Sequence, residues 1–444
     1  MTKSCEPGKV AGRVRAPASK SAMQRAVACA ALASGTSVLR SPSHCADSRA
    51  ALSVASALGA EVRESPGRIE ITGIGFPGLS YFGVQARTLD CGESGLCMRM
   101  FTPIAALFPG RTELRASGSL RRRPLGPIEG PLAELGAETS TLAGLPPVTV
   151  RGPLHGGTAR VDASLSSQFL TGLLVALPLA PDDSELVVSN IVSRGYVGLT
   201  LRTMRTFGVE AAVNADLSRF FVRGRQSYAA ADFEVEGDWS GAAFLLAAGA
   251  IAAGGSRESE GASCADVGGV VVEGLRLDSE QPDRAILDVL QAAGAFVEVR
   301  AADGEARAGA CSVEVRGGRL RAFDFDAADC PDLFPPLAAL AACCPGRTTI
   351  LGAGRLKAKE SDRAAALAEE LGALGARIRV EGDRMIIEGG RLGAGSVDAR
   401  GDHRIAMAAA VAALAADGPV DVIGAECVAK SWPSFFEDLA ALRF

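Results

Sequence analysis

Histidine and aromatic residues are scarce in this sequence. Three histidines in 444 residues argue against a metal centre built from imidazole ligands. An aromatic content of 5% leaves few rings on which nucleic-acid bases could stack. The formal net charge is −5 at pH 7, so no overall basic field attracts polyanions. These scarcities argue against a metalloenzyme and against nucleic-acid binding, and an anionic ligand would require a locally basic site.

Cysteine pairs and long apolar runs are also missing. The eleven cysteines include no C-x-x-C pair, and Cys29, Cys343 and Cys344 lie in Ala/Leu-rich runs. This pattern favours reduced core thiols over a disulfide framework or a zinc site. The longest apolar run, residues 242–255, is too short and too rich in glycine to span a bilayer. Since the first residues show no signal-peptide pattern, we expect a cytoplasmic protein with no membrane partner.

An internal repeat organises the chain. An Ala/Leu-rich run, a turn and a short β-type segment recur six times, with turn residues at Gly35, Gly110, Asp182, Gly254, Gly346 and Gly418. The spacing is 72–75 residues except for one step of 92. A second marker lies between them, with a glycine at Gly59, Gly136, Gly208, Gly294 and Gly375. Each such glycine suits the C′ position of a helix, where φ is positive. We therefore predict an α/β protein with six repeats of helix, strand, helix and one or two strands, the last ending after its second helix.

Basic or hydroxyl residues stand at about nine of twelve expected helix starts, where unpaired N–H groups and the macrodipole favour anions. Ser19 is a plausible N-cap before Lys20. Lys359 and Arg363 are four residues apart, and we expect them to share a helix face and hold one anion. Asp402-His403-Arg404 and Lys430-Ser431-Trp432 are expected to open the last two buried helices.

Each start has a simpler interpretation as a capped surface helix. Capping alone explains Asp332 as well as function does, and Lys357 and Asp362 are interpreted as solvated or helix-supporting charges. For the run Arg121–Arg123 we favour function, because three adjacent cations repel one another without an anion. If three repeats pack about a pseudo-threefold axis, these starts point the same way and form a cationic pocket. The ligand expected there is small and multiply anionic.

Several motifs together resemble the 5-enolpyruvylshikimate-3-phosphate synthase family of enolpyruvyl transferases. They are Lys20-Ser21-x-x-x-Arg25, Arg123-Pro124, Ser166-Ser167-Gln168, Lys359-Glu360-Ser361-Asp362-Arg363, Asp402-His403-Arg404 and Lys430, in order between Gly8 and Leu442. The resemblance implies a two-domain inside-out α/β barrel with three βαβαββ repeats per domain. It implies one discontinuous domain, 1–18 plus 236–444, another at 19–235, and an active site in the interdomain cleft that closes on substrates.

The resemblance also implies the reaction. The enolpyruvyl group of phosphoenolpyruvate passes to the 5-hydroxyl of shikimate 3-phosphate by addition and elimination, with release of phosphate, in a monomer that needs no metal or cofactor. Asp332 would take the hydroxyl proton, and Glu360 or Lys20 would protonate the methylene carbon. Contacts with shikimate 3-phosphate would come from Lys20, Ser21, Arg25, Ser166, Ser167, Gln168, Ser193, Asp332, Arg355 and Lys359. Contacts with phosphoenolpyruvate would come from Lys20, Gly95, Arg123, Gln168, Arg363, Arg404 and Lys430.

Three other functions fit this sequence less well. A UDP-N-acetylglucosamine enolpyruvyl transferase typically has a cysteine shortly before its Arg-Pro pair, and none lies between Arg111 and Arg123. RNA 3′-phosphate cyclases share related folding units but need ATP and a nucleophilic histidine. A non-catalytic anion-binding homologue would not need Asp332 and Glu360 together. One segment, Gly92-Glu93-Ser94-Gly95-Leu96, departs from the Gly-Asn-Ala-Gly-Thr usual in the resembled family.

Overall fold

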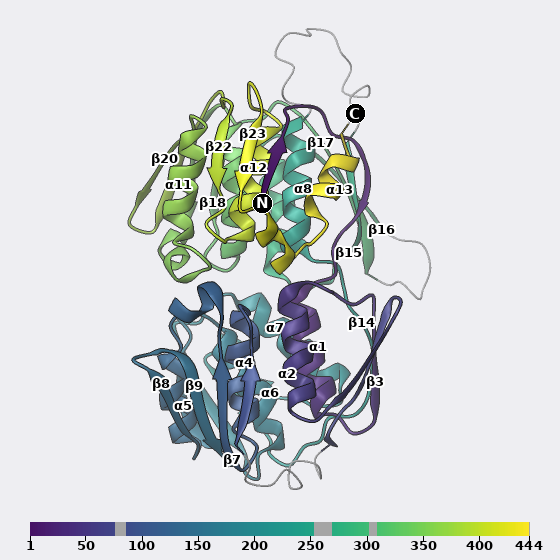
Figure 1. Ribbon diagram of the computed structural model, residues 1–444, viewed down its shortest axis with the longest axis vertical. Coiled ribbons are helices and arrows are strands. Elements are labelled where there is room, and N and C mark those ends of the chain that lie inside the picture. The colour runs from purple at the N-terminus through teal and green to yellow at the C-terminus, as the bar shows by residue number, and fades with distance from the viewer. Residues whose placement is uncertain (76–85, 253–268, 302–308, 444) are drawn as a thin grey trace. The chain divides into compact units, whose positions relative to one another are not determined.

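The computed structural model describes residues 1–75, 86–252, 269–301 and 309–443 (Figure 1). The chain divides into two compact units. The N-terminal unit is Ala18–Val235, and the C-terminal unit joins Met1–Pro17 to Glu236–Phe444. Each unit has a hydrophobic core of its own. The first boundary therefore falls between residues 17 and 18, one residue before the boundary between 18 and 19 that was expected from the sequence.

The described residues of the N-terminal unit form three four-stranded sheets. Its helices are α1 (Lys20–Leu32), α2 (Ala46–Ala57), α4 (Gly95–Ala105), α5 (Glu129–Glu134), α6 (Gln168–Ala176) and α7 (Arg194–Thr206), with 3-10 turns η1 (Gly118–Arg122), η2 (Gly126–Ile128) and η3 (Leu177–Leu179). The strands are β3 (Thr36–Arg40), β4 (Glu61–Ser65), β5 (Arg68–Thr72), β6 (Arg87–Asp90), β7 (Gly110–Arg115), β8 (Glu138–Leu142), β9 (Leu145–Gly152), β10 (Gly157–Asp162), β11 (Ser184–Ser189), β12 (Ala212–Val213), β13 (Arg219–Val222) and β14 (Asp232–Glu234). Their orders are β14-β3-β5-β4, β6-β7-β9-β8 and β10-β11-β13-β12.

The C-terminal unit contains two four-stranded sheets and one of three strands within the described residues. Its helices are α8 (Trp239–Ala252), α9 (Ile286–Ala292), α10 (Phe334–Ala342), α11 (Arg363–Ala373), α12 (His403–Ala413) and α13 (Phe435–Ala441), with 3-10 turns η4 (Pro282–Ala285), η6 (Pro331–Leu333), η7 (Ala353–Ala358) and η8 (Ala425–Lys430). The strands are β1 (Thr2–Cys5), β2 (Gly12–Arg15), β15 (Val270–Arg276), β16 (Phe296–Ala301), β17 (Ala310–Arg316), β18 (Asp324–Asp326), β19 (Gly346–Leu351), β20 (Arg377–Glu381), β21 (Arg384–Gly389), β22 (Gly395–Asp398) and β23 (Val420–Ile423). Their orders are β16-β17-β15-β2, β18-β19-β21-β20 and β1-β23-β22.

One topology recurs in these sheets and confirms the predicted fold class. In β6-α4-β7-α5-β8-β9 the first two strands are parallel and the later pairs are antiparallel. The repeats that begin with α1 and α8 take their first strand from elsewhere in the chain, β14 and β2 respectively. The sixth repeat ends with α13, and β1 pairs antiparallel with β23 in place of its missing hairpin.

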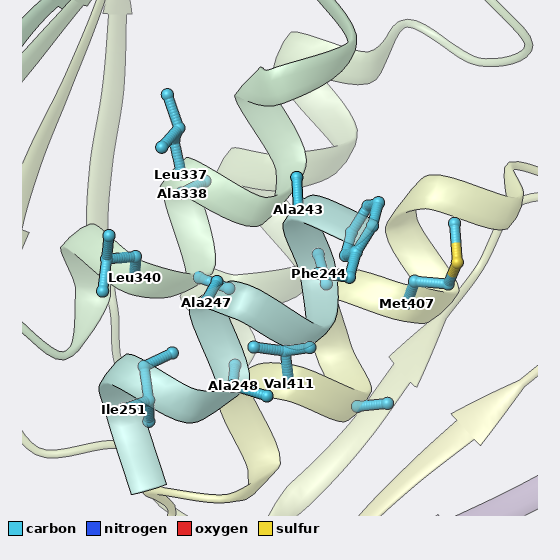
Figure 2. Close-up of a cluster of buried hydrophobic side chains, with 14 of the residues drawn as sticks. Ala243, Phe244, Ala247, Ala248, Ile251, Leu337, Ala338, Leu340, Met407 and Val411 are labelled. Atoms are coloured by element: carbon cyan, nitrogen blue, oxygen red, sulfur yellow. The ribbon is translucent and has the colours of Figure 1, made fainter. Parts of the chain in front are cut away.

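The first helix of every repeat lies inside its unit. Helices α4, α8, α10 and α12 are buried at every residue, as the Ala-rich runs predicted. Figure 1 shows α8 and α12 at the centre of the C-terminal unit, with β20 and β16 at opposite margins. Figure 2 shows how small alanines of α8 and α10 let these helices pack beside Met407 and Val411 of α12. Sheets outside and helices inside make an inside-out barrel of each unit.

The five marker glycines are all C′ residues. Their φ angles are positive: Gly59 106°, Gly136 88°, Gly208 79°, Gly294 90° and Gly375 98°. In all five, the N–H that follows the glycine donates to the carbonyl oxygen five residues earlier at 2.8–3.1 Å. This is the Schellman arrangement, which lets each second helix end and reverse into a strand. The prediction from sequence is confirmed.

The sequence also predicted reduced thiols and no membrane-spanning helix. The ten cysteines in the described ranges are free. None of the described helices is long and apolar enough to cross a bilayer. Residues 253–255, the end of the longest apolar run, lie outside the described residues.

Candidate functional site

In the C-terminal unit, the starts of α10, α11 and α12 bring charged side chains together. Asp332 lies in η6 before α10, Arg363 begins α11, and Arg404 is the second residue of α12. Asp402 N-caps α12, because its carboxylate accepts a hydrogen bond from the backbone N–H of Arg404 at 3.0 Å. The starts of these three helices therefore meet at one end of this unit.

Asp332 is surrounded by cations. Its Oδ1 accepts hydrogen bonds from Arg363 Nη1 at 2.9 Å and from Lys359 Nζ at 3.4 Å, and its Oδ2 accepts one from Arg404 Nη2 at 3.2 Å. Burial by itself would raise the pKa of the Asp332 carboxyl. The positive charges of Arg404, Lys359 and Arg363 outweigh burial and hold that pKa well below its usual range. Asp332 is therefore an ionised carboxylate that the same three cations share.

A second carboxylate holds Arg363 from its other side. Asp402 accepts from Arg363 Nε at 3.0 Å and from Nη2 at 3.2 Å, which is a bidentate contact. Glu360 accepts from Nη2 at 2.7 Å. The Arg363 and Asp402 side chains are 1% and 0% exposed, so the pair is fully desolvated. Although burial opposes it, the attraction of Asp402, Glu360 and Asp332 raises the pKa of Arg363 above its ordinary value.

The N-terminal unit holds a second group of cations. Arg25, one turn into α1, is buried and donates from Nη1 to the Ser21 carbonyl at 2.8 Å. Its Nη2 donates to the carbonyl of Tyr196, near the left-handed residue Ser193 that precedes α7. Lys20 Nζ lies 3.1 Å from the Asp47 carboxylate of α2. Lys20, Ser21, Arg25 and Ser193 therefore lie around the starts of α1 and α7.

A buried arginine joins the remaining predicted residues of this unit. Arg99 Nη1 donates to Gln168 Oε1 at 3.0 Å, and Nη2 donates to the carbonyl of Pro124 at 2.9 Å. Arg123 precedes that proline. A Cβ built on Gly95 would stand 2.7 Å from Nη1 of both Arg99 and Arg123, so Gly95 lies directly against both guanidinium groups. Arg99 thus lies against Gly95, hydrogen-bonds Gln168, and hydrogen-bonds the proline that follows Arg123.

The predicted site residues are buried or half-buried throughout. Asp332, Lys359, Glu360, Arg363 and Arg404 form one ion-pair network. Ser166 accepts the backbone N–H of Gln168 at 3.2 Å, and Ser167 is the residue before α6. Arg355 lies in η7 and donates to the Ala328 carbonyl. No group of His, Cys, Asp and Glu in the described part of the chain is placed to hold a metal ion.

Three local expectations need correction. Lys359 is extended and precedes α11, so it and Arg363 do not share a helix face, yet both contact Asp332 Oδ1. Lys430 ends η8 rather than opening α13, which begins at Phe435. Arg121 and Arg122 are exposed in η1 and only Arg123 is buried, so the arginine run is not one functional cluster. In contrast, Ser19 is confirmed as the N-cap of α1.

Glu93 contacts the turn at the start of η1. Its Oε2 accepts hydrogen bonds from the backbone N–H and the hydroxyl of Ser119 at 3.1 and 2.9 Å. A Cβ on Gly118 would collide with this carboxylate, which therefore lies against the turn that opens η1. The unusual acid before Gly95 consequently has a local structural role.

Sequence reasoning missed Arg99 and the contacts of Asp402. Arg99 is the single charged residue of a helix that is otherwise apolar except for Thr102, a signal that could have marked it. Asp402 was noted in a motif, but its contact with Arg363 spans 39 residues of sequence. Asp47 carried no distinctive pattern at all.

Known proteins resemble this chain both in fold and in sequence. The enolpyruvyl transferase NikO from Streptomyces tendae has the same fold, with a TM-score of 0.73, 18% identity and coverage of 99% of this chain and 96% of that one. The fold is thus that of the enolpyruvyl transferases. Over residues 5–439 the chain matches EPSP synthase (3-phosphoshikimate 1-carboxyvinyltransferase). The chain belongs to this family, as its motifs predicted.

Individual relatives agree with this assignment. The 3-phosphoshikimate 1-carboxyvinyltransferase of Halobacterium salinarum is 40% identical, with 100% of this chain and 99% of the relative covered. The 3-phosphoshikimate 1-carboxyvinyltransferase of Clostridium beijerinckii is 36% identical, with 98% of this chain and 96% of the relative covered. EPSP synthase from Acinetobacter baumannii has a TM-score of 0.80 and 26% identity, covering 100% and 98%. The UDP-N-acetylglucosamine alternative is not favoured by these matches.

Proposed function

We propose that this chain transfers the enolpyruvyl group of phosphoenolpyruvate to the 5-hydroxyl of shikimate 3-phosphate, using residues of both units. The observation that carries the proposal is the carboxylate Asp332 held by three cations at 2.9–3.4 Å. A base beside concentrated positive charge suits a reaction in which a hydroxyl attacks and a phosphate departs. We propose further that the enzyme acts as a cytoplasmic monomer without a cofactor.

Asp332 is the proposed general base. The cations around Asp332 make it a weak proton acceptor, since they hold its pKa well below the usual range. The carboxylate and phosphate of phosphoenolpyruvate compete with Asp332 for Arg363 and Arg404. As these substrate anions take over the guanidinium groups, the Asp332 oxygens are released and their proton affinity rises. Binding of the anions thereby prepares the base.

The remaining predicted residues divide between the two substrates. Lys20, Gly95, Arg123, Gln168, Arg363, Arg404 and Lys430 are proposed for phosphoenolpyruvate. The residues proposed for shikimate 3-phosphate are Ser21, Arg25, Ser166, Ser167, Ser193, Asp332, Arg355 and Lys359. Lys20 and Gln168 are proposed for both substrates. Glu360 or Lys20 would give a proton to the methylene carbon during addition, and elimination then returns a proton and breaks the bond to phosphate.

Gly95→Ala is expected to raise the KM for phosphoenolpyruvate about tenfold. The added Cβ would stand 2.7 Å from Nη1 of Arg99 and Arg123. Because these atoms end flexible side chains, the fold absorbs the methyl group while the guanidinium groups move; losing one charge-assisted hydrogen bond costs about tenfold. Steady-state kinetics would show the KM for shikimate 3-phosphate nearly unchanged. Equal increases for both substrates would contradict the assignment of Gly95.

The affinity for shikimate 3-phosphate is expected to fall above pH 8. Burial lowers the pKa of Lys359 to about 8, although the nearby Asp332 charge acts in the opposite direction. As pH rises through this value the ammonium loses its proton and with it the attraction for an anion. The KM should therefore be about tenfold higher at pH 9 than at pH 7. In Lys359→Arg, which stays charged, this increase should vanish; an identical pH profile would exclude Lys359 as its source.

Deuterium incorporation tests the proposed reaction course. With phosphoenolpyruvate and shikimate 3-phosphate in D₂O, addition places deuterium on the methylene carbon and elimination removes a hydrogen from the resulting methyl group. Mass spectrometry should therefore find deuterium in the enolpyruvyl CH₂ of the product. Product formed without any deuterium would contradict addition and elimination, and absence of product would contradict the transfer itself.

A further inference from the structure

Arg25 is a buried cation whose hydrogen-bond acceptors are all neutral. Its side chain is 2% exposed. Nε donates to the Thr200 hydroxyl at 2.9 Å and Nη1 to the Ser21 carbonyl at 2.8 Å. Nη2 donates to the Thr171 hydroxyl at 3.3 Å and to the Tyr196 carbonyl at 3.2 Å. Across the described ranges of the chain no carboxylate pairs with it, so its charge is available to an anionic ligand.

The contacts leave one donor for that ligand. A guanidinium group has five N–H bonds, and four of them are used by the acceptors above. The fifth is on Nη1. Burial lowers the pKa of Arg25 to about 10, so the group is still charged at pH 7. Arg25 therefore offers an anion one N–H donor and a full positive charge, so its hydrogen bond to the anion is single and not bidentate.

Two buried threonines fix the direction of this donor. The Thr200 hydroxyl donates to the Tyr196 carbonyl at 2.9 Å, which turns its lone pairs toward Arg25 Nε and toward Thr171. The Thr171 hydroxyl, 3.1 Å from that of Thr200, donates to it and accepts from Arg25 Nη2. Both threonines are 0% exposed. Every proton and lone-pair direction in this network is mutually consistent.

We propose that Thr171 and Thr200 are positioning residues that hold Arg25 with its free Nη1–H directed at an anionic group of shikimate 3-phosphate. The inference rests on the proposed role of Arg25 as a ligand of that substrate. Neither hydroxyl can donate to an anionic substrate, because the single O–H bond of each is already used within the network. Their loss should therefore weaken one substrate selectively.

Thr200→Val tests this with a side chain of nearly equal volume. The KM for shikimate 3-phosphate should rise about tenfold, because a buried Nε–H loses its acceptor. The KM for phosphoenolpyruvate and kcat should stay within about threefold, and Thr200→Ser, which keeps the hydroxyl, should behave as the parent chain. Thr171→Val should act in the same direction. Thr203→Val is the matched control, since Thr203 is also buried on α7 and bonds the Leu199 carbonyl at 2.8 Å.

A second measurement does not depend on turnover. The Nε–H resonance of Arg25 should exchange slowly with solvent in the parent chain and in Thr203→Val, and quickly in Thr200→Val. Equal KM increases in Thr200→Val and Thr203→Val, or unchanged protection of Nε–H in Thr200→Val, would overturn the inference. If the parent chain shows no turnover with shikimate 3-phosphate, the proposed function fails, while the exchange measurement still decides whether Thr200 holds Arg25.

Discussion

Asp332→Asn is expected to lower kcat by about 10²–10⁴-fold, the usual contribution of a general base. Asparagine retains the shape of the side chain but cannot accept the hydroxyl proton. The KM for phosphoenolpyruvate should not rise, because the carboxylate that competes for Arg363 and Arg404 is gone. Steady-state kinetics with both substrates varied would separate the two effects.

The control for this variant is Asp326→Asn. Asp326 ends β18, is exposed, and accepts the Ala328 N–H at 2.9 Å. The Asp326→Asn substitution removes a negative charge from the same segment, which leads from β18 into α10. In this variant kcat should change by no more than about twofold. A higher KM with unchanged kcat in Asp332→Asn would mean that Asp332 binds substrate but is not the base.

Arg363→Met is expected to reduce the stability of the C-terminal unit by about 3–5 kcal/mol. The Arg363 and Asp402 side chains are 1% and 0% exposed, so the variant leaves a buried carboxylate without its cation. Urea unfolding followed by hydrogen exchange within this unit would measure the loss. Arg379→Met is the control: Arg379 is 47% exposed and pairs with Glu381 at 2.8 Å, and its loss should cost under about 1 kcal/mol.

The double variant separates stability from activity. Arg363→Met with Asp402→Asn removes both buried charges, so it should recover part of the lost stability. Activity should not return, because the guanidinium proposed for phosphoenolpyruvate is still missing. A double variant no more stable than Arg363→Met would contradict the ion-pair account of this site.

Local chemistry made much of the fold predictable from the sequence. The C′ glycines and the Ser19 cap depend on residues within one turn, and the structure has them where the sequence placed them. The Ala-rich runs likewise indicated helices buried on all sides. The 72-residue spacing could not show that β14 and β2 supply the first strands of two repeats, because these pairings join distant parts of the chain.

Less of the candidate site than of the fold could be predicted from the sequence. Motifs named the residues of the Asp332 network, but not the hydrogen bonds among them. Arg99 and Gln168 are 69 residues apart, and Thr171 and Arg25 are 146 apart. Such contacts depend on how helices pack. At Gly172, where a Cβ would stand 2.7 Å from the Arg99 carbonyl oxygen, α4 and α6 approach closely enough for Arg99 to reach Gln168.

Phosphate release from phosphoenolpyruvate is the measurement that tests the central claim most directly. The full chain would be assayed with phosphoenolpyruvate alone, with added shikimate 3-phosphate, and with added UDP-N-acetylglucosamine. The account predicts release with shikimate 3-phosphate only, in amounts equal to the acceptor consumed. Release that requires UDP-N-acetylglucosamine, or no release with either acceptor, would contradict it.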